Sequence, residues 1–265
     1  MTLRASIARL LLPLLLAASG EPAHGSDVDL LQADGSYLRL GAPASRIITL
    51  APHLAELVHA AGAGDKLIAT VAFSEYPATV RDLPRIGDAF RLDIERIVAL
   101  DPDLVIAWDS GNPHAAVRQL TGLGIPVWSV EISAPPEIAA TVEALGGAAG
   151  TTLAAERAAQ VLRRRLASLA ATYGGAAPLS YFYQVDSRPL FTVSGRHLIS
   201  QGLALCGGRN VIAEEPGLAF QVSHESVLVA NPDALFAPIP DGGDDPLADW
   251  HDWPAMNAVQ HDALF

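Results

Sequence analysis

From Ile47 onward the chain alternates two hydrophobic patterns, and this alternation restricts its fold more than any other feature. Short apolar runs at 47–50, 67–72, 104–108 and 125–130 have strand length and no polar alternate face. Apolar residues at helical spacing lie between them, in 54–61, 93–100, 113–120 and 136–145. Uniformly apolar strands are typical of parallel sheets with helices on both faces. The pattern predicts an α/β lobe over residues 46–150.

Glycine and asparagine positions indicate where these helices begin and end. Asn112 and Pro113 occupy the N-cap and first-turn positions of the third helix. Gly62, Gly122 and Gly146 stand at predicted helix ends.

A long helix is predicted over 151–173, because this stretch is rich in Ala, Leu and Arg and contains neither Gly nor Pro. Such a helix would be roughly 35 Å long. A break at 174–178 follows, and then a second series with strands at 179–185 and 190–193 and a helix at 197–206. We therefore expect an α/β protein of two Rossmann-like lobes, with 151–174 as the connecting helix and 178–265 as the second lobe.

An internal repeat supports two related lobes. Residues 93–108 align with 223–238 at a constant offset of 130, and each copy predicts a capped short helix, a Pro-Asp turn and a buried strand. The generic demands of an αβ unit could also produce this likeness. Glu95 and Glu225 are identical in the two copies and should project into water. There each would interact favourably with the N-terminal dipole of its helix.

The first 25 residues are typical of a secretory signal. Arg4 and Arg9 precede an apolar run at 10–18, and small residues follow it, with cleavage expected after Gly25. The run is too short to span a bilayer. We expect an exported protein in the periplasm, without a lipid anchor because no Cys lies near the cleavage site.

The charge balance disfavours nucleic acid and anionic membrane surfaces as partners. Seventeen Lys and Arg face twenty-nine Asp and Glu, for a formal net charge of −12. Binding to phosphate backbones requires a basic face, which this composition does not provide.

Signatures of catalysis are absent, since the sequence has no Gly-x-Ser-x-Gly, Walker or His-Glu-x-x-His motif. Ser194 and His197 could serve an exported α/β hydrolase, but their position at a helix start favours a capping role. His53, Glu56 and His59 spread over about a third of a helix circumference, so no metal site is predicted. We expect a binding protein, without a cofactor of its own and not an enzyme.

Aromatic residues indicate where a ligand could bind. Ligands of open parallel sheets bind beyond the carboxyl ends of the strands, and two aromatic residues fall directly there. Others lie in the loop after the second strand or in irregular stretches of the second lobe, whereas Trp128, inside its strand, is assigned to the core. The candidate ligand-binding residues are Phe73, Tyr76, Phe90, Trp108, Phe191 and Phe220.

Three segments resemble one family, the cobalamin-binding branch of the periplasmic solute-binding proteins, over about residues 46–235. Relatives in this group bind haem or ferric siderophores and have two Rossmann-like lobes bridged by one helix. The segments are ITLAPHLAELVHAAGAGDKLIATVAFSEYP, RIGDAFRLDIERIVALDPDLVIAWDSGN and LFTVSGRHLISQGLALCGGRNVI.

The resemblance implies the extracytoplasmic capture subunit of an ABC importer, which carries cobalamin between its lobes as a transported ligand. Phe73, Trp108 and Phe191 match aromatic positions of the family. Phe90 lies beside Ala89, which stands where the family has Trp, and Phe220 lies near another such position. The haem and siderophore alternatives stay open, because suitable axial ligands or cations are present in His53, Tyr76, Arg91, Arg188 and Arg196.

The resemblance also implies partners for surface residues. In cobalamin importers one Glu on each lobe docks onto the permease dimer, and Glu95 and Glu225 match those positions. We expect the binding protein itself to be a monomer.

The family pairs the equivalent of Cys206 with a Cys in a terminal helix, although Cys206 also continues an apolar stripe that predicts burial. The chain ends at 263–265 in what resembles the start of a strand, so we expect a truncated C-terminus.

Overall fold

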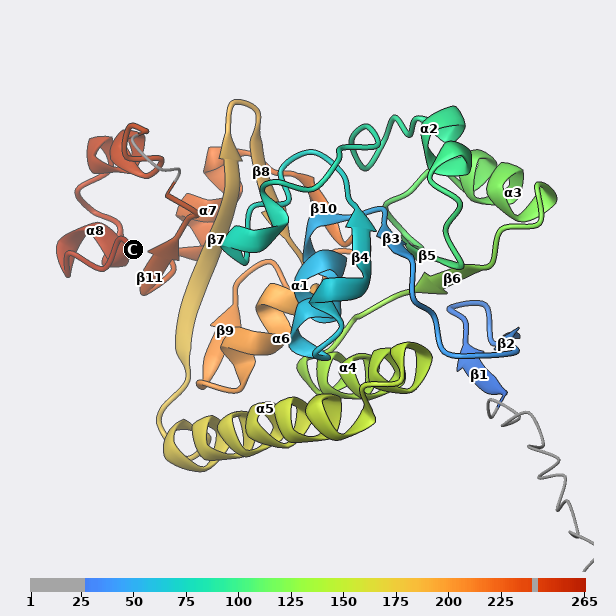
Figure 1. Cartoon of the computed structure of the whole chain (residues 1–265). Helices are drawn as coiled ribbons and strands as arrows, with labels where there is room; N and C mark the ends of the chain where they lie inside the picture. The colour runs from blue at the N-terminus through green and yellow to red at the C-terminus, as the bar shows by residue number, and fades with distance from the viewer. Residues whose placement is uncertain (1–26, 240–242) are drawn as a thin grey trace, which may run out of the picture.

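The computed structural model describes residues 27–239 and 243–265, and the predicted signal lies outside them. The chain forms two α/β lobes (Figure 1). Four parallel strands form the sheet of the first lobe, in the order β4 (Leu67–Ala69), β3 (Ile47–Thr49), β5 (Leu104–Trp108) and β6 (Val127–Val130). This confirms the predicted parallel sheet.

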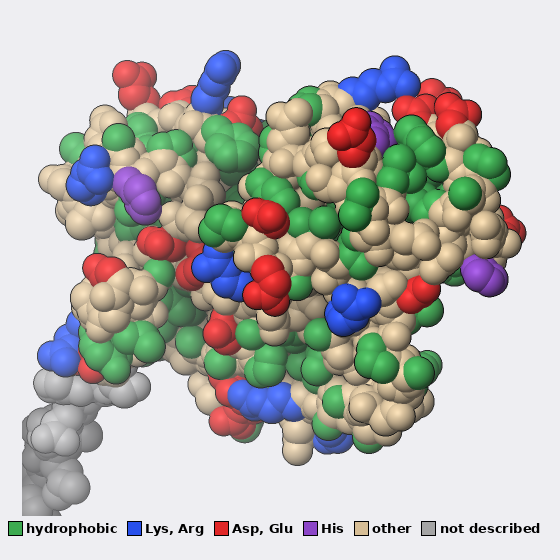
Figure 2. All heavy atoms as spheres, turned by 180° about the vertical axis from the view of Figure 1, so that it is seen from behind, with side chains coloured by type: hydrophobic (Ala, Val, Ile, Leu, Met, Phe, Trp, Pro, Cys, Tyr) green, Lys and Arg blue, Asp and Glu red, His purple; other side chains and the backbone are tan. Residues whose placement is uncertain are grey.

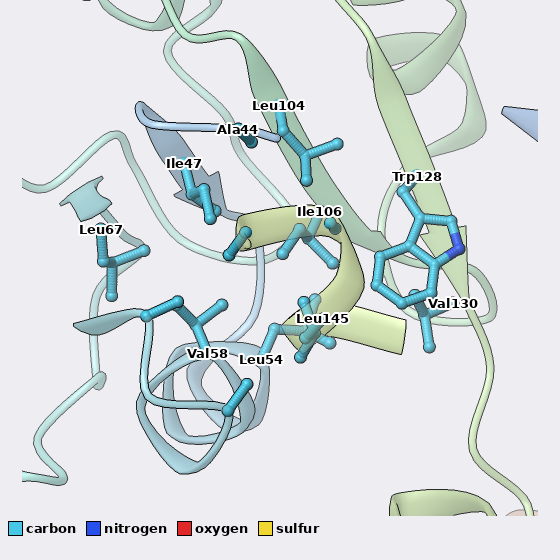
Figure 3. Packing of buried hydrophobic residues seen from close by; sticks show 14 of the residues in the cluster. Ala44, Ile47, Leu54, Val58, Leu67, Leu104, Ile106, Trp128, Val130 and Leu145 are labelled. Atoms are coloured by element: carbon cyan, nitrogen blue, oxygen red, sulfur yellow. The ribbon is translucent and has the colours of Figure 1, made fainter. Parts of the chain in front are cut away.

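Both faces of this sheet are buried, which explains why its strands are apolar throughout. Successive side chains of a strand point to opposite faces. Leu104 and Ile106 join one hydrophobic cluster, whereas Val105 and Ala107 join the other. The first cluster packs beneath α1 (Pro52–Ala60) and α4 (Pro135–Ala149), and includes Trp128 as predicted (Figure 3). The second packs beneath α2 (Ile94–Ala99) and α3 (His114–Gly122).

Helix α4 does not end at Gly146, and that prediction was wrong. The helix continues to Ala149 and ends at Gly150, whose φ is 68°. A Cβ on Gly146 would lie 2.2 Å from the Cβ of Ala155 in α5 (Thr152–Tyr173). Gly146 therefore permits close contact between two helices that run side by side along one end of the molecule (Figure 1). The ends expected near Gly62 and Gly122 agree with α1 and α3.

The sheet of the second lobe is mixed. Strand β7 (Leu179–Ser187) runs parallel to β9 (Gly208–Asn210) and β11 (Ala234–Phe236) and antiparallel to β8 (Leu190–Val193), which pairs with β10 (Ala219–Gln221). Its core includes Phe182 and Trp250. The helices are α6 (Leu198–Ala204), α7 (His224–Ala230), α8 (Asn257–Gln260) and the 3-10 turn η3 (Ala248–Asp252).

Cys206 lies beyond the end of α6, because the helix ends at Ala204, two residues before the predicted end. Its thiol is therefore exposed, and the predicted burial in the apolar stripe was wrong. A disulfide at Cys206 stays a prediction.

The structure adds an N-terminal hairpin, β1 (Val28–Leu31) and β2 (Tyr37–Leu40), which the sequence did not predict. It packs beside β6, because Trp128 donates its indole N–H to Leu31 O at 2.8 Å and Ala33 N–H donates to Ser129 O. Short 3-10 turns, η1 (Gly64–Lys66) and η2 (Ala78–Val80), complete the first lobe. Residues 263–265 lie in parallel beside β11, as strand-like as their sequence indicated.

Two further findings bear on partners. No helix within the described ranges is both long and apolar enough to cross a membrane. On the face shown in Figure 2, basic side chains of the described residues are scattered among acidic ones and do not gather into a patch.

Candidate functional site

A cavity of about 480 Å³ lies between the two lobes. From the first lobe it is lined by residues at the start of α1 and after the carboxyl ends of β5 and β6, which is where ligands of parallel α/β sheets bind. From the second lobe it is lined by residues between β8 and α6 and by one residue before β10. The lining residues are His53, Glu56, Leu57, Trp108, Ser110, Glu131, Ile132, Ser133, Ile138, Arg196, His197, Leu198 and Leu218.

Trp108 is the main aromatic surface of this cavity and is held on several sides. Asn112 Oδ1 accepts the Trp108 backbone N–H at 2.7 Å. The His53 ring meets the indole edge to face, with centroids 5.4 Å apart and planes at 87°. A Cβ on Gly111 would lie 1.9 Å from the indole ring, so only glycine leaves room for the ring there. The indole is therefore fixed before any ligand arrives.

Asn112 connects the loops that surround Trp108. Its buried amide donates to Leu50 O and to Ala89 O, each at 2.8 Å, while its oxygen holds Trp108. The prediction that Asn112 caps α3 was wrong, because Pro113 occupies the N-cap position. The amide instead satisfies three backbone groups, of which Leu50 O is buried and the other two are partly buried.

Burial shifts the pKa values of three titratable side chains that line the cavity. Burial lowers the pKa of His53, although the nearby Glu131 acts in the opposite sense. The His53 side chain is exposed to solvent inside the cavity, yet surrounding protein atoms still displace water from it. Burial also lowers the pKa of His197 and raises that of Glu56.

His197 caps α6 and Ser194 flanks its start, in agreement with the predicted structural role. His197 Nδ1 accepts the Ile199 N–H at 3.2 Å at the N-cap of α6, and Ser194 Oγ accepts the Arg196 N–H at 3.3 Å. No group of three or more His, Cys, Asp or Glu side chains in the described part of the chain is arranged to hold a metal ion.

Trp108 is the one predicted ligand-binding residue that lines the cavity. Phe73, Tyr76 and Phe90 are exposed on loops, at 81%, 69% and 70%. The loop with Phe73 follows β4, so it lies at the same carboxyl edge of the parallel sheet as Trp108. Phe73 has a φ of 65°, a left-handed conformation that is strained for an aromatic residue.

Phe191 and Phe220 lie on opposite faces of the β8–β10 ladder. Phe220 pairs with Thr192, whereas Phe191 pairs with Gln221. Side chains of paired residues share a face, and neighbouring residues alternate. The two rings therefore point to opposite sides of the ladder, and Ala219, paired with Val193, shares the face of Phe191.

Glu131 was missed by the sequence reasoning, although a signal was present. It directly follows β6, the position relative to its strand that identified Phe73 and Trp108 as candidates. Its Oε2 accepts the Ser110 N–H at 2.9 Å, which anchors the carboxylate at the cavity wall.

Glu95 and Glu225 are exposed in the first turns of α2 and α7, as predicted. Neither takes part in a hydrogen bond or ion pair with the described residues, so both carboxylates are available at the surface. Their docking role stays a prediction.

The two lobes, the connecting helix and the cavity between them define a two-lobed solute-binding protein. The family model described as periplasmic binding protein matches residues 47–265. The chain belongs to this family.

Curated relatives cover both lobes. The vitamin B12-binding protein of Vibrio cholerae serotype O1 is 37% identical over 227 residues, which cover 84% of this chain and 80% of that protein. The vitamin B12-binding protein of Vibrio campbellii is 38% identical over 208 residues, 78% of this chain and 75% of that protein.

Solved structures have the same fold. The crystal structure of the periplasmic vitamin B12-binding protein BtuF of Vibrio cholerae matches with a TM-score of 0.77 and 37% identity, and covers 84% of this chain and 87% of that one. The periplasmic heme-binding protein HutB of Vibrio cholerae matches with a TM-score of 0.71 at 22% identity over 83% and 88% of the chains. The two-lobed fold predicted from the sequence is confirmed.

Proposed function

We propose that this chain is the periplasmic solute-binding subunit of an ABC transporter and that its transported ligand is cobalamin. The observation that carries the proposal is the interlobe cavity with a pre-fixed Trp108, in a chain similar across both lobes to named vitamin B12-binding proteins. Small-molecule sites are mostly apolar and preformed, with a few polar groups that set orientation. This cavity has that character.

The ligand would contact more than the described cavity. A corrin ring with its substituents is larger than 480 Å³, so part of it would extend beyond the cavity. Phe73, Tyr76 and Phe90 lie on exposed loops and could cover that part once the lobes close. Phe191 and Phe220 lie on opposite faces of the β8–β10 ladder, so one of the two rings would contribute from the second lobe.

Delivery requires a permease, and Glu95 and Glu225 are the proposed contacts. The internal repeat places one exposed carboxylate on each lobe in the same local setting. A two-lobed protein that faces a two-fold permease would use one such contact per lobe. The same proposal includes a secretory signal at 1–25, lobes at 46–150 and 178–265, a connecting helix at 151–174 and a monomeric state.

The test is direct binding by the purified, processed protein. Titration with cyanocobalamin should quench tryptophan fluorescence, because a conjugated macrocycle next to an indole accepts its excitation energy. Haemin is the matched competitor, since haem-binding proteins share the fold. Binding of haemin with a Soret band, without binding of cyanocobalamin, would refute the cobalamin assignment and favour haem.

A further inference from the structure

Two opposite charges face the cavity from different lobes without pairing with each other. Glu131 follows β6 in the first lobe, and Arg196 lies between β8 and α6 in the second. Ion pairs among the described residues join other partners, and none involves Glu131 or Arg196. The two charges are therefore both available to a ligand placed between them.

The Glu131 carboxylate is anchored and still has accepting capacity. Its Oε2 accepts the Ser110 N–H, and its Oε1 accepts no hydrogen bond from the described residues. A carboxylate oxygen with a free lone pair is a strong acceptor for an N–H group.

The Arg196 guanidinium is equally available. Its backbone N–H is held by Ser194 Oγ, which fixes the start of the side chain, but its guanidinium donates to none of the described residues. It also borders a shallow hollow with Glu214 and Glu215, and it pairs with neither of them. Arg196 is the one cation that lines the described cavity.

The remaining titratable groups do not add positive charge. His53 and His197 have pKa values lowered by burial, so both imidazoles favour the neutral form near neutral pH. Glu56 and Glu131 together outnumber Arg196. A ligand that brings a carboxylate into this cavity would meet the Glu131 carboxylate as well as Arg196.

We propose that Glu131 and Arg196 together recognise a primary amide on the periphery of the ligand. Arg196 donates to the amide oxygen and Glu131 accepts from the amide NH₂. This inference rests on the proposed function and deepens it, because the periphery of cobalamin carries neutral amides where haem carries propionates. A carboxylate in the same place satisfies Arg196 but is repelled by Glu131, since like charges at close range are costly.

The test compares cyanocobalamin with its monocarboxylates, in each of which one propionamide is hydrolysed to a carboxylate. The wild-type protein should bind at least one of these acids about tenfold more weakly than cyanocobalamin. A repulsion between like charges that would shift a pKa by about one unit corresponds to this factor. The quantity measured by calorimetry is the ratio of the two dissociation constants.

Two variants should move this ratio in opposite directions. Glu131→Gln removes the repulsion and keeps a polar side chain, so the preference for the amide should fall to within about threefold. Arg196→Gln removes the attraction for the carboxylate, so the preference should increase. A merely structural role would not produce shifts of opposite sign.

Glu156→Gln is the matched control, because it removes the same charge from an exposed position on α5, outside the cavity. Its ratio should equal that of the wild type. Far-ultraviolet circular dichroism and urea unfolding verify that each variant is folded.

The outcomes separate the two proposals. If the wild type binds cyanocobalamin but accepts every monocarboxylate equally well, or if Glu131→Gln leaves the ratio unchanged, the amide inference is overturned and the function stands. If both variants weaken the binding of cyanocobalamin and of the monocarboxylates by the same factor, the two residues do not distinguish amide from acid, and the inference is also overturned. Failure to bind cyanocobalamin overturns both.

Discussion

The two copies of the internal repeat have the same local structure up to the ends of their strands. Both helices have side-chain N-caps, and both turns contain a residue in the left-handed conformation. The N-caps are Asp93 and Ser223, and the left-handed residues are Asp101 and Asn231, with φ of 46° and 45°.

The Pro-Asp turns also anchor the neighbouring strand in the same way. Asp103 accepts the Ser45 N–H at 2.8 Å and the Ser45 hydroxyl at 2.7 Å. Asp233 accepts the Ser180 N–H at 3.0 Å and the Ser180 hydroxyl at 2.6 Å. The repeat is therefore a structural unit and more than a likeness of sequence.

The copies differ where their strands end. Strand β5 ends at Trp108, which lines the cavity, whereas β11 ends at Phe236, which stacks on Phe265 with centroids 5.5 Å apart. The shared part of the repeat places one exposed Glu residue on each lobe, whereas the unshared part places an aromatic residue, Trp108, in the cavity from the first lobe only. The proposed docking contacts are therefore alike on the two lobes, whereas the contributions of the two copies to the cavity differ.

The largest expected effect tests the symmetric part. The double variant Glu95→Ala, Glu225→Ala should bind ligand normally but lose about 2–5 kcal/mol of docking, as when one partner of a desolvated charge pair is removed. Ligand binding is measured by calorimetry and uptake in vesicles that contain the cognate permease. Glu156→Ala is the control for net charge. Full uptake by the double variant would exclude a docking role for both residues.

The next effect tests the anchoring of the asymmetric site. Asn112→Ala should lower the free energy of unfolding by about 2–4 kcal/mol, because it leaves one buried and two partly buried backbone groups without their partners. Asn210→Ala is the matched variant in the second lobe, where the amide donates to Val193 O and Ser200 Oγ. Urea unfolding should show a comparable loss for both. Only Asn112→Ala should also change the Trp108 fluorescence, and an unchanged spectrum would contradict the anchoring role.

Trp108 itself comes next. Trp108→Ala should weaken cobalamin binding by about 1–3 kcal/mol, as expected for an aromatic anchor of a binding site. Gly111→Ala should act in the same direction, because its new methyl group would displace the indole. The repeat aligns Trp108 with Pro238, so Pro238→Ala is the control and should bind normally. Unchanged affinity of Trp108→Ala, measured by calorimetry, would remove this residue from the site.

The sequence predicted the scaffold better than the site, for a physical reason. Strands such as Leu104–Trp108 are identified by burial on both faces, which is visible in any local window. Gly146 and Asn112 were misread because each serves a distant contact, with Ala155 in one case and with Leu50 and Ala89 in the other. Local patterns do not contain such contacts.

Prediction of the site residues from the sequence was limited by the same lack of long-range information. Trp108 was found because the carboxyl end of a parallel strand is a general ligand position. Phe220 was placed with Phe191 because sequence proximity to a family position does not reveal which face of a strand a side chain occupies. Glu131 and Arg196 line one cavity only when the two lobes are assembled, so no single segment points to both.

The register between β8 and β10 gives a smaller, sharper prediction. Of the variants Phe191→Ala and Phe220→Ala, one should weaken cobalamin binding by about 1 kcal/mol, the lower range for an aromatic contact, whereas the other should leave it nearly unchanged. The two variants remove the same side chain from neighbouring strands and so control for each other. Equal losses of affinity in calorimetry would show that the ladder does not decide which ring meets the ligand.

The smallest expected effect is a pH dependence of stability. It arises from His53 beside Trp108, on the lobe whose copy of the repeat contributes to the cavity. His53 stands against Trp108, and burial holds its pKa below the ordinary value of 6.5. The unfolded chain therefore binds more protons than the folded protein between the lowered pKa and 6.5. Stability should be fully present above about pH 6.5, fall as the pH drops through this window, and level off below the lowered pKa.

His53→Gln isolates this contribution, since it keeps a polar side chain that does not titrate. Urea unfolding between pH 8 and pH 5 should show a smaller loss of stability for the variant than for the wild type. His197 also has a lowered pKa and is present in both proteins, so it contributes equally to their pH dependence. The stability of the double variant His53→Gln, His197→Gln should therefore depend on pH even less. Bound cobalamin would cover His53 and strengthen the same effect, so its affinity should also decrease below about pH 6.5. Parallel pH profiles of wild type and His53→Gln would show that the imidazole beside Trp108 is no more buried in the folded protein than in the unfolded chain.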